Sequence, residues 1–157
     1  MTKDATRPAF LRHYSDLEEA TGSGDLRAML APFGRRLGLH RVGVNQETIA
    51  PGCRTSEPHA HSHEDEFVYV VDGHPDVWID GVLHAMQPGD GVAFPAGTGI
   101  AHCLINNSDT LVRLLIVGDN HGDDRIAYPV NPEFRGRPDY WHDAPARPLG
   151  AHDGRPG

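Results

Sequence analysis

Short apolar runs alternate with turn residues through the middle of the chain, from residue 41 to residue 118. The runs are rich in Val, Ile, Phe, Tyr and Trp, which favour strands, and turn signals interrupt them every eight to twelve residues. The stretch leaves no room for the helical crossovers that a βαβ fold needs. The pattern predicts strands over residues 41–50, 57–61, 66–72, 76–79, 82–86, 91–94, 102–106 and 111–117.

The turns between these runs favour antiparallel pairing. Asp72-Gly73 and Asp80-Gly81 each stand between two apolar runs, and both residues of an Asp-Gly pair tolerate positive φ, as tight hairpins require. Short strands at this spacing predict an all-β fold, either an antiparallel barrel or a double-sheet jelly roll.

The segments on either side follow other patterns. Within residues 1–40, a capping Asp25 and a terminating Gly34 enclose a short predicted helix with Leu26, Met29, Leu30 and Phe33 at helical spacing. Residues 119–157 hold six prolines and scattered aromatic residues, which cannot build a core of their own. We expect one domain: an N-terminal packing segment (1–40), a barrel (41–118) and an irregular arm (119–157). We expect this arm to pack over the barrel or over a partner subunit, and we expect its last ten residues to be disordered.

Composition excludes several kinds of chemistry. The chain of 157 residues carries 14 basic and 22 acidic side chains, a net charge of −8, which argues against a nucleic-acid partner. Lys3 is the only lysine, so the domain has no Schiff-base or phosphate-loop lysine. Cys53 and Cys103 make no disulfide framework, and neither a secretory leader nor a membrane span is visible. We expect a cytoplasmic protein with reduced thiols and no membrane partner.

Histidines cluster where two of the predicted strands meet. His59 and His61 are two residues apart, so in a strand both side chains point to the same face. If residues 62–65 form a turn, Glu66 opens the next strand and returns to that face. His102 follows a Gly- and Pro-rich turn and offers a third imidazole. Three imidazoles and one carboxylate suit one divalent transition metal (Mn, Fe, Ni, Co or Zn) with open positions left for a small-molecule substrate.

These residues also lie in two motifs that resemble those of the cupin superfamily. The first motif runs through Gly52, His59, His61, Glu66 and Gly73, with one residue more than usual between Gly52 and His59. The second runs through Gly89, Pro95, Gly97, His102 and Asn106, and four residues instead of two separate Gly97 from His102. This enlarged turn alters the rim of the pocket.

The resemblance extends to a group of small bacterial single-domain cupins, some of which carry a sugar-phosphate isomerase label. It is carried by the segments PDVWIDG, FPAGTGIAH and YPVNPE. It implies a double-stranded β-helix barrel and, from the open sheet edges and the Pro-rich arm, a homodimer with exchanged arms. The implied metal ligands are His59, His61, Glu66 and His102, inside the barrel and towards one end.

The motifs leave the reaction open, because this fold carries many activities. We expect a small metalloenzyme, an oxygenase, decarboxylase, lyase or isomerase, acting on a small carboxylate, keto or sugar-like molecule. The alternatives are a non-catalytic small-molecule-binding barrel and a sugar-phosphate isomerase-like enzyme. No spacing argument selects a catalytic acid or base, although Arg54 could reach a substrate. His63 is expected in the turn, and Cys103 on the face opposite to His102.

Overall fold

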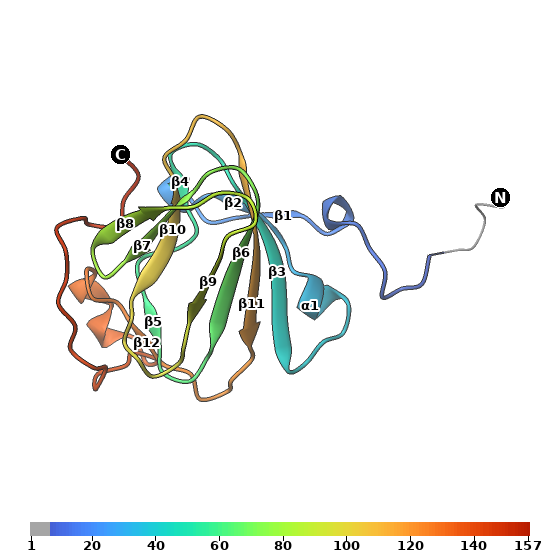
Figure 1. Cartoon of the computed structure of the whole chain (residues 1–157). Helices are drawn as coiled ribbons and strands as arrows, with labels where there is room; N and C mark the ends of the chain where they lie inside the picture. The colour runs from blue at the N-terminus through green and yellow to red at the C-terminus, as the bar shows by residue number, and fades with distance from the viewer. Residues whose placement is uncertain (1–6) are drawn as a thin grey trace.

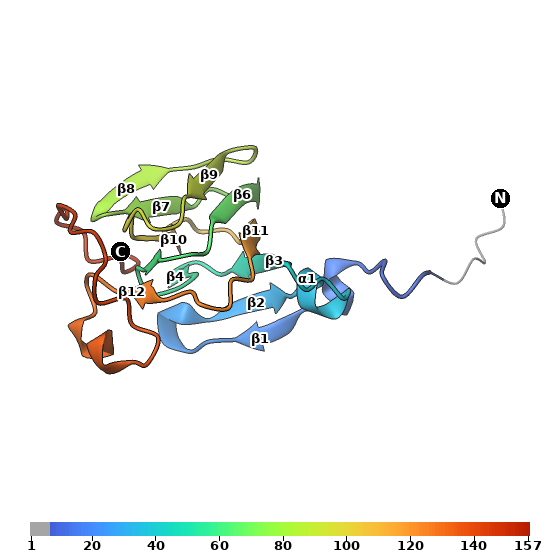
Figure 2. The same ribbon diagram turned by 90° about the horizontal axis from the view of Figure 1, so that it is seen from below.

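Two antiparallel sheets face each other and close a barrel in the computed structural model, which describes residues 7–157 (Figures 1 and 2). The predicted double-sheet jelly roll is confirmed. The larger sheet contains, in spatial order, β1 (Glu19–Thr21), β2 (Ala28–Ala31), β3 (Val42–Ile49), β11 (Val112–Asp119), β6 (Glu66–Asp72) and β9 (Gly91–Phe94).

The smaller sheet covers the other side of the barrel. Its spatial order is β4 (Cys53–Arg54), β10 (His102–Asn106), β7 (Asp76–Ile79) and β8 (Val82–Ala85). A short third sheet pairs β5 (Ala60–His61) with β12 (Ile126–Ala127). The helical elements are η1 (Tyr14–Asp16), η2 (Gly24–Leu26), α1 (Phe33–Arg36) and η3 (Pro132–Gly136).

Alternation along the strands places the core between the two sheets. In β6, Val68 and Val70 are fully buried, whereas Phe67 and Tyr69 point outward and are exposed. Inward side chains of β3, β11 and β10 complete the apolar cluster at one end of the barrel, including Ile49, Leu104, Val112 and Leu114. The other end is left for polar residues.

The helix predicted between Asp25 and Gly34 is wrong. The chain forms η2, then β2, and only then the four-residue α1. Strand β2 pairs with β1 on one edge and with β3 on the other, with Ala28 opposite Ile49. Because these pairings bury Ala28 against the core and satisfy the backbone on both edges, they outweigh the helical spacing of the apolar residues.

The C-terminal arm packs over the smaller sheet. Its final residues are ordered, contrary to the expected disorder of the last ten. The indole Nε1 of Trp78 donates to the carbonyl of His152 (2.8 Å), and the Arg54 Nη1 donates to the carbonyl of Gly154 (3.0 Å). Both donors are buried, and the carbonyl groups of the arm accept these two hydrogen bonds.

Within residues 7–157, no helix is both long and apolar enough to cross a membrane.

Candidate metal centre

The structure brings the four predicted ligands together at the polar end of the barrel. One nitrogen or oxygen atom from each of His59, His61, Glu66 and His102 lies within 4.8 Å of the others. His59 forms a backbone bridge with His102, so β10 sits beside the segment that carries the two neighbouring histidines. Glu66 begins β6 after the turn, as the pattern predicted.

Hydrogen bonds on the outer side fix each imidazole. His59 Nδ1 lies 2.9 Å from the carbonyl oxygen of Glu57, and His61 Nδ1 lies 2.6 Å from Asp124 Oδ2. His102 Nδ1 lies 3.3 Å from the carbonyl oxygen of Ile100. Because these oxygens only accept, each Nδ1 must carry a proton and donate it. In the neutral rings, every Nε2 therefore presents a lone pair.

These lone pairs converge on one another and on the Glu66 carboxylate. His59 Nε2 and His61 Nε2 are 3.0 Å apart, and His102 Nε2 is 3.2 Å from Glu66 Oε1. His61 Nε2 lies 3.7 Å from Glu66 Oε2. Four acceptors that face each other at these distances repel unless a proton or cation lies between them. The donor set therefore fits a divalent cation.

The charges at the centre support the same fit. Burial lowers the pKa of His59 to about 3, helped by the neighbouring imidazoles, so this ring is neutral at pH 7. Burial disfavours the charged form of Glu66, but in the metal-free protein a hydrogen bond from His102 and the charge of the imidazoles when they are protonated outweigh burial and lower the pKa of Glu66 to about 2. Neutral imidazoles and an ionised carboxylate are the forms in which these side chains bind a metal.

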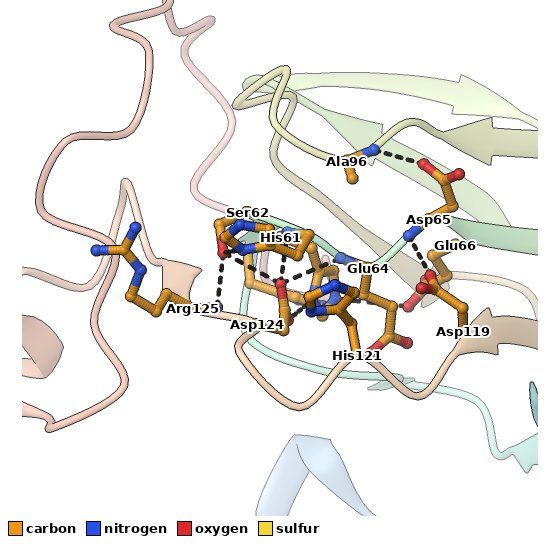
Figure 3. Close-up of polar contacts among 12 residues, drawn as sticks. His61, Ser62, Glu64, Asp65, Glu66, Ala96, Asp119, His121, Asp124 and Arg125 are labelled. Atoms are coloured by element: carbon orange, nitrogen blue, oxygen red, sulfur yellow. Dashed lines mark hydrogen bonds and ion pairs between the residues drawn. The ribbon is translucent and has the colours of Figure 1, made fainter. Parts of the chain in front are cut away.

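Asp124 organises the turn that carries the centre (Figure 3). Its Oδ2 accepts the bond from His61, and its Oδ1 accepts from the backbone N–H groups of His63 (2.8 Å) and Glu64 (3.2 Å). Burial opposes ionisation of this side chain, but these hydrogen bonds lower the pKa of Asp124. Asp124 was not predicted, because no local signal links residue 124 to a turn about sixty positions earlier.

A second pair of carboxylates fastens the same turn to the barrel. The Asp119 Oδ1 accepts from the backbone N–H of Asp65 (2.8 Å), and the Asp65 Oδ1 accepts from the N–H of Ala96 (2.8 Å), as Figure 3 shows. His63 is exposed and stacks on His121, with ring centroids 4.9 Å apart. It therefore lies in the turn, as predicted, and outside the four-residue cluster.

The enlarged turn between Gly97 and His102 is tied to both sides of the centre. The N–H of Gly97 donates to the carbonyl of His61 (3.0 Å), and the N–H of Ala101 donates to Asp80 Oδ1 (2.9 Å). The ring of Phe94 stacks on His102, with centroids 3.6 Å apart, and supports its orientation. The extra residues thus form an ordered rim.

Other residues considered from the sequence lie away from the centre. Arg54 is almost fully buried and binds Asp25 (3.0 Å) and Glu57 (2.8 Å), so it does not reach a substrate. Cys103 points to the opposite face, as expected, where burial raises the pKa of its thiol to about 12. The Asn106 amide donates to the carbonyls of Ile49 and Thr110 and so serves the turn after β10.

Comparisons with known proteins agree with this fold. The model of the cupin domain family matches residues 45–118. The polyketide synthase CurC of Streptomyces cyaneus is 30% identical over 134 residues, which cover 74% of this chain and 82% of CurC. Protein SchB of Streptomyces halstedii is 37% identical over 94 residues, 59% of this chain. That match spans 63% of SchB, less than two thirds of its length.

Several solved structures also resemble this fold. A sugar phosphate isomerase of the cupin superfamily from Silicibacter pomeroyi has 32% identity and a TM-score of 0.66, over 73% of this chain and 78% of that one. The polyketide cyclase RemF of Streptomyces resistomycificus has 19% identity and a TM-score of 0.59, over 71% of this chain and 79% of RemF. Oxalate decarboxylase of Bacillus subtilis, which has Mn(II) centres, has 19% identity and a TM-score of 0.54, over 72% of this chain and 30% of that one. The last two likenesses concern the fold alone.

Proposed function

The chain belongs to the cupin superfamily, and from its polar end we propose that it is a metal-dependent enzyme acting on a small carbonyl compound. The observation that carries the proposal is the convergence of three imidazole lone pairs and one carboxylate. In each imidazole the outer nitrogen is already taken by an oxygen acceptor. The cation is held by His59, His61, Glu66 and His102, and its identity stays open among Mn, Fe, Ni, Co and Zn.

A divalent cation at this position supplies a Lewis acid for a carbonyl or hydroxyl oxygen of the substrate. The protein contributes fixed ligands: Asp124 holds His61, the Glu57 carbonyl holds His59, and Phe94 supports His102. One carboxylate and three neutral rings leave a net positive charge on a bound dication, which favours an anionic or enolisable oxygen ligand. The buried apolar end of the barrel excludes water from below the centre.

The relatives point to carbonyl chemistry in two forms. The Silicibacter pomeroyi protein is named a sugar phosphate isomerase, and CurC is named a polyketide synthase. Open-chain sugars and polyketides share a carbonyl group whose neighbouring carbon can lose a proton. Within residues 7–157 no lysine is present and no arginine lies at the centre, so the sequence and site offer no evident phosphate clamp. We therefore propose that the site activates a carbonyl group, as an isomerase, a cyclase or a lyase would. The proposal does not require a phosphate group on the substrate.

Metal content and proton exchange test this function together. Elemental analysis of the purified protein is compared with His61→Ala and with His63→Ala, a matched histidine loss in the exposed turn. We expect about one equivalent of metal in wild type and in His63→Ala, and its loss in His61→Ala. In deuterium oxide, the metal-loaded protein is expected to replace the hydrogens beside the carbonyl of hydroxyacetone, followed by proton NMR.

Two outcomes would contradict the proposal. Absence of metal from the wild-type protein, even after reconstitution, would contradict the proposal of a metal-dependent enzyme. Metal without any exchange of carbonyl probes would favour the second candidate, a non-catalytic binding barrel.

We also propose a cytoplasmic location, because Cys53 and Cys103 are both free thiols.

A further inference from the structure

One ionisable residue inside the barrel has no part in the candidate metal centre. Glu47 lies on β3, where Leu30 of β2 and Leu114 of β11 stand directly opposite it on its two sides. Residues that face each other in antiparallel strands share one side of the sheet, so Glu47 points inward with Leu114, which is fully buried. Only 8% of Glu47 is exposed.

Its position is at the boundary between the apolar core and the polar end. Ile49 lies two residues after Glu47 on β3 and belongs to the core cluster. Across β11, Gly118 pairs both with Glu66 of β6 and with Gly43 of β3, so Glu66 and Glu47 point into the same interior from the two strands beside β11. The charge of Glu66, one of the four clustered side chains, acts on Glu47 across the interior. Glu47 itself is outside that cluster.

The Glu47 carboxyl has no protein partner. Among the hydrogen bonds and ion pairs of residues 7–157, none involves this side chain. In the same range, the fully enclosed side-chain atoms without a partner belong to Gln46 and Asn131. The Glu47 oxygens are not among them, so these unpaired oxygens remain accessible to water. A buried carboxyl without a partner lowers stability, and such groups are found where chemistry uses them.

We propose that Glu47 transfers the proton in the carbonyl chemistry of this site. This inference rests on the proposed function, and it assigns the acid–base group that the sequence did not select. The substrate class is a carbonyl compound with a hydrogen on the adjacent carbon. Its oxygen lies at the four-residue centre and its chain extends toward Glu47.

The proton transfer is balanced within the substrate and this one side chain. The Glu47 carboxylate takes a proton from the carbon beside the carbonyl, and the C–H electron pair becomes the C=C bond of an enolate. The negative charge then lies on the oxygen. The protonated Glu47 exchanges this proton with solvent and then protonates the same carbon, which gives isotope exchange. Where the adjacent carbon carries a hydroxyl, protonation of the former carbonyl carbon, with transfer of the hydroxyl proton to the enolate oxygen, gives isomerisation. No oxidant or other reactant is needed.

Electrostatics support this use of Glu47. Burial, followed by the charge of Glu66, raises the pKa of Glu47 to about 8 in the metal-free protein. An acid–base group works best when its pKa lies near the working pH, because both of its forms are then accessible. A nearby cation would lower this value, which favours the carboxylate for proton removal.

The test uses the isosteric variant Glu47→Gln. The matched control is Glu18→Gln, the same change beside the outer face of β3, where Glu18 accepts from the Thr48 hydroxyl (3.4 Å). Deuterium exchange into hydroxyacetone is followed by proton NMR, and metal content is measured for each protein. We expect Glu47→Gln to keep its metal and to lose about 100-fold in exchange rate, with Glu18→Gln unchanged.

Two further readouts separate a chemical role from a structural one. Glu47→Asp retains a carboxyl, and we expect it to recover a measurable part of the lost exchange. Infrared spectra of the metal-free proteins at about pH 6 should contain the band of a buried protonated carboxyl that is missing in Glu47→Gln. This second readout needs neither metal nor substrate.

The outcomes distinguish this proposal from the one on which it rests. Wild-type exchange with an equally active Glu47→Gln would overturn the role of Glu47 and leave the metal-dependent function intact. Loss of metal from Glu47→Gln would also overturn it, because Glu47 would then be part of the centre. Wild-type protein without metal or without exchange would overturn both.

Discussion

Asp124 is the residue on which the geometry of His61 most depends. Its carboxylate accepts the Nδ1–H of His61 at 2.6 Å and holds two backbone N–H groups of the following turn. A carboxylate in this position fixes the tautomer of a metal-binding histidine and increases its basicity. The identity of Asp124 therefore matters for the metal although it is not one of the four clustered ligands.

Replacing Asp124 by Asn should weaken metal binding while the barrel stays folded. The amide keeps the size of the side chain but removes its charge, so we expect affinity to fall by about 10- to 100-fold. Competition with a chromophoric chelator measures the affinity, and Asp123→Asn, next in the chain and exposed, is the control. Equal affinities in the two variants would contradict this role.

Glu47 should make the stability of the metal-free protein depend on pH. Its pKa rises from 4.5 to about 8 on folding, because of burial and then the charge of Glu66. Between these values the folded protein holds a proton that the unfolded chain has released, so the free energy of unfolding falls as pH rises. Below pH 4.5 the proton on Glu47 makes its full contribution to the free energy of unfolding, and above about pH 8 this contribution is lost.

Urea unfolding of wild type and Glu47→Gln tests this dependence. At about pH 5 the two metal-free proteins should be close in stability, and at about pH 8.5 the variant should be more stable by a few kcal/mol. The neutral His59 titrates in the acid range in both proteins, so the difference between them isolates Glu47. A constant difference across pH would contradict the raised pKa.

At the scale of elements, the C-terminal arm is part of the barrel's stability. The arm accepts bonds from Trp78 and Arg54, and the N–H of Gly150 donates to the carbonyl of Asp80 (2.7 Å). Gly154 has φ +79°, and a Cβ there would lie 2.3 Å from Pro58 Cγ. The arm therefore fits closely over the segment that leads to His59.

Removing residues 148–157 should destabilise the protein through these contacts. The buried Arg54 guanidinium and the Trp78 indole would lose their carbonyl acceptors, which costs about 1–3 kcal/mol for each buried donor left unpaired. Thermal unfolding of the metal-free proteins measures the loss. The control is Leu149→Ala, an exposed side chain in the same segment. An unchanged melting temperature after truncation would show that residues 148–157 do not stabilise the barrel.

The elements that the sequence predicted best are those that alternation and turn residues mark within a few positions of the chain. The strand over 66–72 and the hairpin at Asp80-Gly81 follow from alternation and turn residues alone, and both were confirmed. Strand β2 was missed because its structure depends on pairing with β3, which local spacing does not encode. The ordered tail was missed for the same reason: its hydrogen-bond partner Trp78 lies 74 positions away.

The candidate site divides in the same way. His59, His61, Glu66 and His102 follow a short-range motif, and the structure brings them together. Asp124 and Glu47 lie on other strands or loops and carry no recognisable spacing, so only the closed barrel places them near the four. Motifs thus predict the clustered residues, whereas the groups around them require the tertiary structure.

At the scale of the whole molecule, the outer face of the larger sheet is apolar and uncovered. Phe67 is 42% exposed, Tyr69 39% and Val71 40%, all on β6. A cavity of about 390 Å³ opens on this face beside Val42 and Phe67. Residues 7–13 project away from the barrel in Figures 1 and 2, with Phe10 73% exposed. Exposed apolar surface of this extent is typical of an interface.

The Pro-rich arm, which was expected to be exchanged, packs on the barrel of its own chain. We propose instead that two copies pair through this face, with residues 7–13 of each chain lying on the partner. A two-fold pair covers the same patch on both copies and removes the exposed aromatic residues from water. Light scattering at micromolar concentration should give twice the mass of one chain, and Tyr69→Lys should reduce it to a single chain. Val82→Lys, at a side chain 50% exposed on the smaller sheet, is the matched control. A monomeric wild-type protein would refute the pairing, and a dimeric Tyr69→Lys would place the interface elsewhere.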